Sequence, residues 1–257
     1  LIEAAYDPAL PAFYDLIPDL LLITAVDQIS LNNNADNDGV VLPGITDQVS
    51  IQSELLEYID LFRTWDYTAS VDSIETSLAV YYAEQLMASV REEAATSNIN
   101  IYQYMATRAS LNQKLMALRE AAAKLTRDFG DWRVPWGEIN RYQRLNGDII
   151  QDFNDDEPSI AVGFASSRWG SLASFGARTY PGTSRMYGTS GNSFVAVVEF
   201  GDRLEAKAIT VGGLQNDPSL PHFDDQAEMY ANGEFRDVLF YREDVEANQE
   251  RAYNPGG

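Results

Sequence analysis

Residues 193–211, SFVAVVEFGDRLEAKAITV, decide the fold class of this chain. Residues 193–200 are apolar on both faces and residues 204–211 alternate more clearly, so both stretches are predicted to be strands. Gly201-Asp202-Arg203 would join them as a tight hairpin, because glycine supplies backbone angles that other residues avoid. A shorter strand is predicted over residues 238–241. The second half of the chain therefore predicts an antiparallel sheet.

The first half of the chain reads as helical. Apolar residues recur at helical spacing over residues 50–63, and residues 110–129 are rich in strong helix formers and closed by Gly130. Ser70 is predicted to cap a further helix, whose apolar stripe runs over residues 78–86. These segments predict a helical region ahead of the sheet.

Helices followed by an antiparallel sheet define the α+β class. Another short helix is predicted to begin within residues 99–105. We expect a helical region over residues 1–130 and a strand-rich region over residues 131–257.

Composition narrows the possible functions. The chain has 257 residues, of which 45% are hydrophobic, enough for a sizeable core. Its net charge of −21, from 39 acidic and 18 basic residues, argues against nucleic acid and membrane surfaces as partners. The absence of cysteine excludes disulfides, thiolate zinc sites and a cysteine nucleophile in this chain. No apolar run approaches the roughly 18 residues that a membrane span needs.

The start of the chain is unusual. Leu1 is not preceded by methionine, and no signal-peptide pattern is visible. We expect the chain to be a piece of a longer protein.

One stretch resembles a nucleophile elbow. Residues 188–192, GTSGN, nearly match G-x-S-x-G, and His222 lies downstream of Ser190. Asn192 replaces the final glycine, however, and the stretch precedes a strand, whereas the elbow lies between a strand and a helix. The favoured interpretation is a glycine-rich loop.

His222 is the single histidine and a candidate general base. Asp224 or Asp225 could orient its ring, but no serine or threonine is placed by sequence to receive its help. A structural histidine bonded to a neighbouring carboxylate or carbonyl is favoured. Both carboxylates also suit the first turn of a helix.

Asn34, Asp36 and Asp38 resemble the opening of a calcium loop, with oxygen ligands at alternate positions. Ile45 stands where a bidentate acid should close the loop, so a solvated turn is favoured. We expect no cofactor in this chain.

Trp132, Trp136 and Trp169 lie in turn-rich sequence. They could line an apolar pocket, but aromatic side chains in such segments more often pin loops onto a core.

Several ordered stretches together resemble the penicillin acylase family. Residues 134–141, VPWGEINR, are similar to its V-P-W-G-x-x-x-R segment, and residues 56–66 to its L-x-x-W-D helix end. Residues 191–194 and the turn 212–218 are similar to its G-x-S strand and G-Q-S-x-x-P turn, and residues 221–226, PHFDDQ, to its S-P-H-Y-x-D-Q. The matching positions, expected to be structural, are Trp136, Gly137, Arg141, Gly191, Ser193, Gln215, Pro221, His222, Asp225 and Gln226. The nearest subgroup is the acyl-homoserine-lactone and aliphatic acylases.

This resemblance implies a specific chemistry. The family consists of N-terminal-nucleophile amide hydrolases with a four-layer αββα core, in which a precursor cuts itself to expose a serine. That serine attacks the amide carbonyl, its own α-amine acts as base, and a backbone N–H and an asparagine hold the oxyanion. The motifs matched here belong to the C-terminal part of the β chain, so a partial αββα sandwich is expected.

The chain also departs from the family pattern. Leu1 has no nucleophilic group, the family serine and oxyanion asparagine lie upstream of the matched region, and Asn192, which stands in the G-x-S motif, is not assigned the oxyanion role. The turn at residues 212–215, GGLQ, differs from the usual G-Q-S order. No catalytic residue is therefore assigned, and the substrate-binding residues are unknown.

Two hypotheses remain. In the first, this is the C-terminal part of a periplasmic or secreted acylase, inert alone, whose partners are the remainder of the acylase and a small amide substrate; calcium could bind elsewhere in the full-length protein. In the second, it is a stand-alone binding or structural module that has lost the chemistry. The first predicts exposed apolar sheet surface and poor solubility, because residues 193–200 would lack their neighbours.

Overall fold

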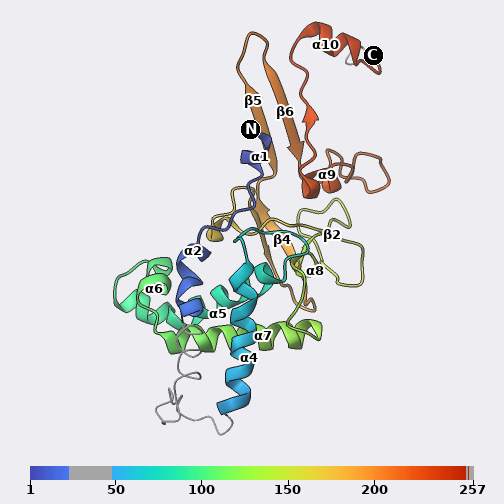
Figure 1. Ribbon diagram of the computed structural model, residues 1–257. Coiled ribbons are helices and arrows are strands. Elements are labelled where there is room, and N and C mark those ends of the chain that lie inside the picture. Colours follow the sequence, from blue (N-terminus) through green and yellow to red (C-terminus); the bar gives the residue numbers. More distant parts are fainter. Residues whose placement is uncertain (23–47, 253, 255–257) are drawn as a thin grey trace.

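The computed structural model describes residues 1–22, 48–252 and 254 (Figure 1). The molecule is elongated, with long helices at one end and two small sheets toward the other (Figure 1). The helices are α1 Ile2–Ala5, α2 Phe13–Leu16, α4 Gln48–Leu61, α5 Ile74–Thr96, α6 Ile101–Thr107, α7 Leu111–Phe129, α8 Trp136–Ile139, α9 Ala227–Asn232 and α10 Arg242–Ala247, with 3-10 turns η1 Phe62–Thr64 and η2 Ser167–Trp169. The strands are β1 Asn140–Tyr142, β2 Ile160–Ala161, β3 Phe175–Arg178, β4 Met186–Gly191, β5 Phe194–Glu199, β6 Glu205–Thr210 and β7 Arg236–Asp237. The α+β class is confirmed.

Local signals explain the limits of α7. The hydroxyl of Ser110 accepts from the N–H of Gln113, and the side chain of Gln113 accepts from the N–H of Ser110, which completes a capping box. Gly130 ends the helix with φ of 89°, in the left-handed region that glycine adopts without strain. The predicted helix over residues 110–129 is confirmed.

The predicted cap of α5 was wrong. Ser73 caps this helix, and its hydroxyl accepts from the N–H of Thr76 at 3.0 Å. The carbonyl of Ser70 instead accepts from the N–H of Ser73 at 3.2 Å, so Ser70 belongs to the turn before the helix. The predictions for α4 and α6 hold within a few residues.

A buried charge ties α7 to the N-terminal segment. Lys114 has a side chain only 2% exposed, and its Nζ lies 2.5 Å from Oδ2 of the half-exposed Asp19. The ammonium group of Lys114 is therefore paired with a carboxylate that lies 95 residues away in the sequence.

The strands form two sheets. The first sheet has the strand order β2-β1-β4-β3. In this sheet β1 runs parallel to β4, and the other two pairs of neighbouring strands are antiparallel. The second is antiparallel in the order β5-β6-β7. The strand predicted over residues 238–241 was misplaced. The strand that pairs with β6 is β7, Arg236–Asp237. The pairing ends at the next residue, where the N–H of Val238 donates to the carbonyl of Ala206 at 2.8 Å.

The main core joins the helices to the turn-rich segments. Trp136 and Trp169 are 3% and 1% exposed within it, and Trp132 packs edge-on against Tyr58 at 4.9 Å. The tryptophans thus pin loops onto the helices, as the favoured interpretation predicts.

A smaller apolar cluster lies between the sheets, where Tyr230 packs with Phe164, Phe175 and Ile209. None of the described helices is long and apolar enough to cross a membrane.

The tip of the β5–β6 hairpin is tied to α10. Arg203 forms ion pairs with Glu243 and Asp244, and its guanidinium lies 4.2 Å from the ring centre of Tyr241. The hydroxyl of Tyr241 accepts from the N–H of Leu204 at 2.8 Å.

Candidate functional site

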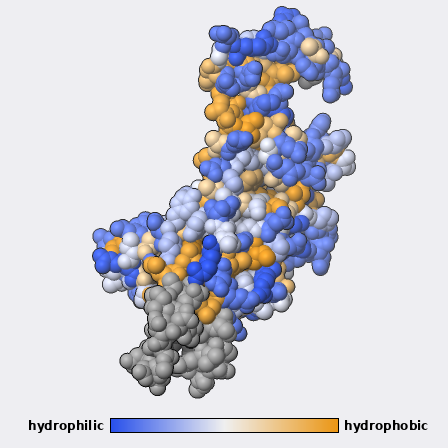
Figure 2. Space-filling view, viewed as in Figure 1, coloured by the Kyte–Doolittle hydropathy of each residue, from blue (hydrophilic) through white to orange (hydrophobic). Residues whose placement is uncertain are grey.

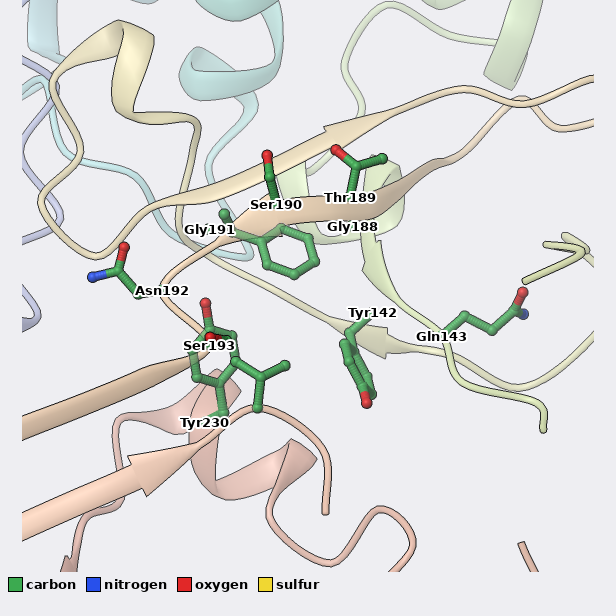
Figure 3. Close-up of a pocket in the computed structure, with 11 residues that line it drawn as sticks. Tyr142, Gln143, Gly188, Thr189, Ser190, Gly191, Asn192, Ser193 and Tyr230 are labelled. Atoms are coloured by element: carbon green, nitrogen blue, oxygen red, sulfur yellow. The ribbon is translucent and has the colours of Figure 1, made fainter. Parts of the chain in front are cut away.

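A cavity of about 200 Å³ lies where the two sheets meet (Figure 3). Tyr142 of β1, Phe175 of β3, Tyr230 of α9 and Val211 supply aromatic and apolar walls. Gln143 and residues 188–193, from the end of β4 to the residue before β5, complete the lining. Such a lining suits a small apolar or aromatic group beside a polar backbone.

A β-bulge shapes the polar side of this cavity. In the pairing of β3 with β4, Gly176 lies opposite Ser190 and Ala177 opposite Gly188, so Thr189 is an extra residue. The hydroxyl of Thr189 donates to the carbonyl of Gly176 at 3.0 Å. The interpretation of residues 188–192 as a loop was wrong, because β3 supplies the backbone partners that make most of the stretch a strand.

Ser190 does not have the surroundings of an activated nucleophile. Its side chain and that of Thr189 point to the same side of β4, away from Tyr142 and Tyr230 (Figure 3). His222 is not among the residues that line the cavity, and its Nδ1 lies 2.7 Å from Oδ2 of Asp225. The structure thus pairs His222 with a neighbouring carboxylate, in a side chain that is 65% exposed.

The motif at residues 221–226 forms a folded turn. The N–H of Gln226 donates to the carbonyl of Gly212 at 2.8 Å, and the N–H of Gln215 donates to that of His222 at 3.0 Å. Arg144 donates to the carbonyls of Phe223 and Gln215, the latter at 2.9 Å, and stacks on the Phe223 ring at 4.2 Å. The sequence alone did not single out Arg144. The available signal was a basic residue shortly after a strand, in a chain that is strongly acidic.

The motif at residues 136–141 fastens β1 to its surroundings. The N–H of Gly137 donates to the carbonyl of Val71 at 2.7 Å. Arg141 donates to the carbonyl of Gly137 at 2.8 Å and to the hydroxyl of Ser159 at 2.9 Å, and burial lowers the pKa of its guanidinium. These contacts are structural, and they place β1 at one wall of the cavity.

Asn140 is a second residue that sequence reasoning missed. It is fully buried, and its amide nitrogen donates to the carbonyls of Val162 at 2.7 Å and Phe164 at 2.8 Å. Its amide oxygen has no hydrogen-bond partner among the described residues, and Asn140 lines a cavity of about 20 Å³, room for about one water molecule. Trp136, Trp169 and Glu84 also line this small cavity, and burial raises the pKa of the Glu84 carboxyl.

The calcium-loop candidates Asn34, Asp36 and Asp38 lie outside the described residues. Among the residues that the structure describes, no group of three or more acidic or histidine side chains could hold a metal ion. The described part of the chain is therefore an α+β scaffold with an aromatic cavity and no assembled serine–histidine pair.

The comparisons with known proteins assign a family. The family model described as penicillin amidase matches residues 2–247, and the chain belongs to this family of amide hydrolases. A thermostable penicillin G acylase from Alcaligenes faecalis is similar in structure, with a TM-score of 0.42 and 14% sequence identity. The match covers 96% of this chain and 46% of the acylase, so the chain spans less than half the length of that protein.

Proposed function

We propose that this chain is the C-terminal part of an acylase that hydrolyses a linear carbon–nitrogen amide bond, with a serine nucleophile supplied from upstream. The family match over residues 2–247 carries this proposal. It is supported by the site, because Ser190 points away from the aromatic side of the cavity and His222 is bonded to Asp225. The motif residues of this chain then act as scaffold rather than as catalysts.

The proposed reaction has two steps. The serine hydroxyl attacks the amide carbonyl while the α-amine of the same residue takes its proton. The resulting α-ammonium gives this proton to the nitrogen of the amine product as the carbon–nitrogen bond of the tetrahedral intermediate breaks. Water then hydrolyses the resulting ester and releases the carboxylic acid. The proposed substrates are N-acyl-homoserine lactones or penicillin-type amides. This chain would contribute the rigid wall formed by Tyr142, Phe175 and Tyr230.

The cellular location that we propose follows from membership of the same family. We place the whole acylase in the periplasm or outside the cell, with any calcium ion bound in the full-length protein. Sequencing the DNA upstream of Leu1 tests this setting. A reading frame with a signal peptide and an internal self-cleavage junction is expected, whereas a start codon directly before Leu1 would favour the stand-alone module.

The activity is tested by comparing the whole acylase with the 257-residue chain. Release of acid from acyl-homoserine lactones and phenylacetyl amides is expected from the whole protein only. Ser190→Ala in the whole protein should keep turnover within about twofold, with Thr189→Ala as the matched control at the neighbouring hydroxyl. Turnover by the chain alone that Ser190→Ala abolishes would overturn the proposal. A whole protein that folds yet hydrolyses no amide would instead support a binding or structural module.

A further inference from the structure

The cavity between the two sheets begins as a gap in the first sheet, where β1 separates from β4. Among the described strands, β1 pairs with β4 only as far as Met186 and Tyr187. Strand β4 continues to Gly191, and from Gly188 onward its edge toward β1 has no strand partner in the described sheet. The backbone groups of a strand face its two edges in turn, so part of the polar backbone of residues 188–191 faces this gap.

Two side chains that follow β1 keep the gap open. The amide of Gln143 donates to the carbonyl of Asn154 at 2.8 Å and accepts from the N–H of Asn154 at 2.9 Å. The guanidinium of the next residue, Arg144, donates to the carbonyls of Phe223 and Gln215. These bonds fix the chain that follows β1, and closing the gap would require breaking them. The cavity is therefore largely preformed, as small-molecule sites usually are.

Tyr230 brings an unpartnered hydroxyl to this cavity. The residue lines the cavity although it is only 2% exposed, and its hydroxyl has no hydrogen-bond partner among the described residues. Burial raises the pKa of this hydroxyl, so it stays protonated and can donate a hydrogen bond at neutral pH. Figure 3 shows Tyr230 and Tyr142 across the cavity from residues 188–191. Since buried donors are almost always bonded, we expect this hydroxyl to bond to the molecule that occupies the cavity.

Size and charge decide which molecule fits. The cavity has a volume of about 200 Å³, and an apolar cavity of about 150 Å³ is enough to hold a benzene ring. Phe175 and Tyr142 supply aromatic walls, which contact another ring by stacking or edge-on. No charged side chain is among the described residues that line the cavity, so an ionised ligand would lose its hydration without compensation. The net charge of −21 further disfavours an anion.

We propose that this cavity binds a small neutral aromatic molecule that carries a hydroxyl or carbonyl group. The ring lies against Phe175 and Tyr142, and the polar group bonds to the hydroxyl of Tyr230. The open edge of β4 at residues 188–191 offers further backbone partners to the same polar group. This inference goes beyond the proposed hydrolysis, because the whole described lining belongs to this chain and the ligand needs no amide bond.

Phenol is a suitable probe, because it has one ring, one hydroxyl and no amide bond that the acylase could hydrolyse. Isothermal titration calorimetry of the whole acylase with phenol measures the dissociation constant. Benzoate has the same ring with a charged carboxylate, and it should bind at least about tenfold more weakly. A whole protein that binds no phenol would overturn the proposal, and equal affinity for benzoate would overturn the neutral class of ligand.

Two variants test whether the probe lies in the cavity. Val211→Trp fills the cavity and should raise the dissociation constant of phenol at least about tenfold. Tyr230→Phe removes only the hydroxyl and should raise this constant about three- to tenfold, the effect of one hydrogen bond. Tyr230→Phe keeps the test decisive if Val211→Trp does not fold, because it breaks no side-chain hydrogen bond between described residues.

Exposed apolar surface is the competing place for an aromatic probe. Apolar side chains gather over the β5–β6 hairpin in Figure 2, where Phe194 and Phe200 are 59% and 84% exposed. Phe200→Ser is therefore the matched control and should change the affinity for phenol by less than about twofold. Unchanged affinity in both cavity variants, or a loss confined to Phe200→Ser, would overturn the proposal. Amide hydrolysis by a whole protein that binds no phenol would remove this site and leave the proposed function standing.

Discussion

Gly137 and Val71 lie so close that a Cβ on Gly137 would come within 2.9 Å of the Cβ of Val71. The N–H of Gly137 donates to the Val71 carbonyl at 2.7 Å, so neither residue can move away without losing this bond. The contact joins α8, which leads directly into β1, to the turn that precedes α5, which explains why the motif needs glycine at this position.

Gly137→Ala should lower the free energy of unfolding by about 1–3 kcal/mol, since an added methyl group forces the backbone apart. Urea unfolding followed by circular dichroism measures the change. Gly201→Ala is the matched control, because the nearest atom to its Cβ lies at an ordinary 3.6 Å. Equal stabilities of the two variants would contradict the packing argument.

Asn140→Ala should destabilise the protein by about 1–3 kcal/mol, because it leaves the buried carbonyl of Val162 without its hydrogen-bond partner. Thermal unfolding measures the loss. Gln103→Ala, at an exposed position of α6, is the control and should change stability by less than about 0.5 kcal/mol. A crystal structure should also show one ordered water bonded to the Asn140 amide oxygen.

Asp66→Asn should lower the melting temperature by a few degrees near pH 7, and this difference should shrink as the pH falls below 3.8. The hydroxyl and N–H of Thr68 donate to the Asp66 carboxylate and hold its pKa below the ordinary value of 3.8. A lowered pKa gives stability that is present above the ordinary value and lost as the pH falls through the folded value. Melting curves of both proteins from pH 2 to 7 should converge at the acid end; a constant difference would refute the assignment.

Asp19→Ala should destabilise the protein more than Lys114→Met. The first leaves the buried Lys114 ammonium unpaired, at a cost of about 2–3 kcal/mol, whereas the second replaces the cation by an apolar chain of similar length. Unfolding of the two single variants and the double variant separates these effects. The reverse order would show that the pair itself is the larger source of stability.

His222→Gln should change the free energy of unfolding by less than about 1 kcal/mol, because its pair with Asp225 is solvent-exposed. Amide hydrolysis by the whole acylase should be unaffected. A large loss of turnover with unchanged stability would return His222 to the list of catalytic candidates.

The elements that could be predicted have their signals close together in the sequence. Helix α7 is an example, since Ser110, Gln113 and Gly130 fix both of its ends locally. The two serines before α5 show the limit of this approach. Ser70 and Ser73 both suit a cap, and the choice depends on which hydroxyl reaches a free N–H of the helix.

The candidate site could not be assembled from the sequence. The cavity brings Tyr142, Phe175 and Tyr230 together from three separate elements. Arg144 reaches the carbonyl of Phe223 across 79 residues. Contacts of this range leave no periodic pattern, and the parallel pairing of β1 with β4 left none either. The apolar stretch of residues 193–200 did predict exposed sheet surface, because a strand that is apolar on both faces needs neighbours on both sides.

The bulge at Thr189 bears on how this strand can vary in length among related proteins. A deletion elsewhere in β4 would turn every following side chain to the other side of the sheet, because strand side chains alternate. Removing Thr189 would instead restore a regular ladder and leave Ser190 opposite Gly176. Natural insertions and deletions in β4 should therefore concentrate at this one position.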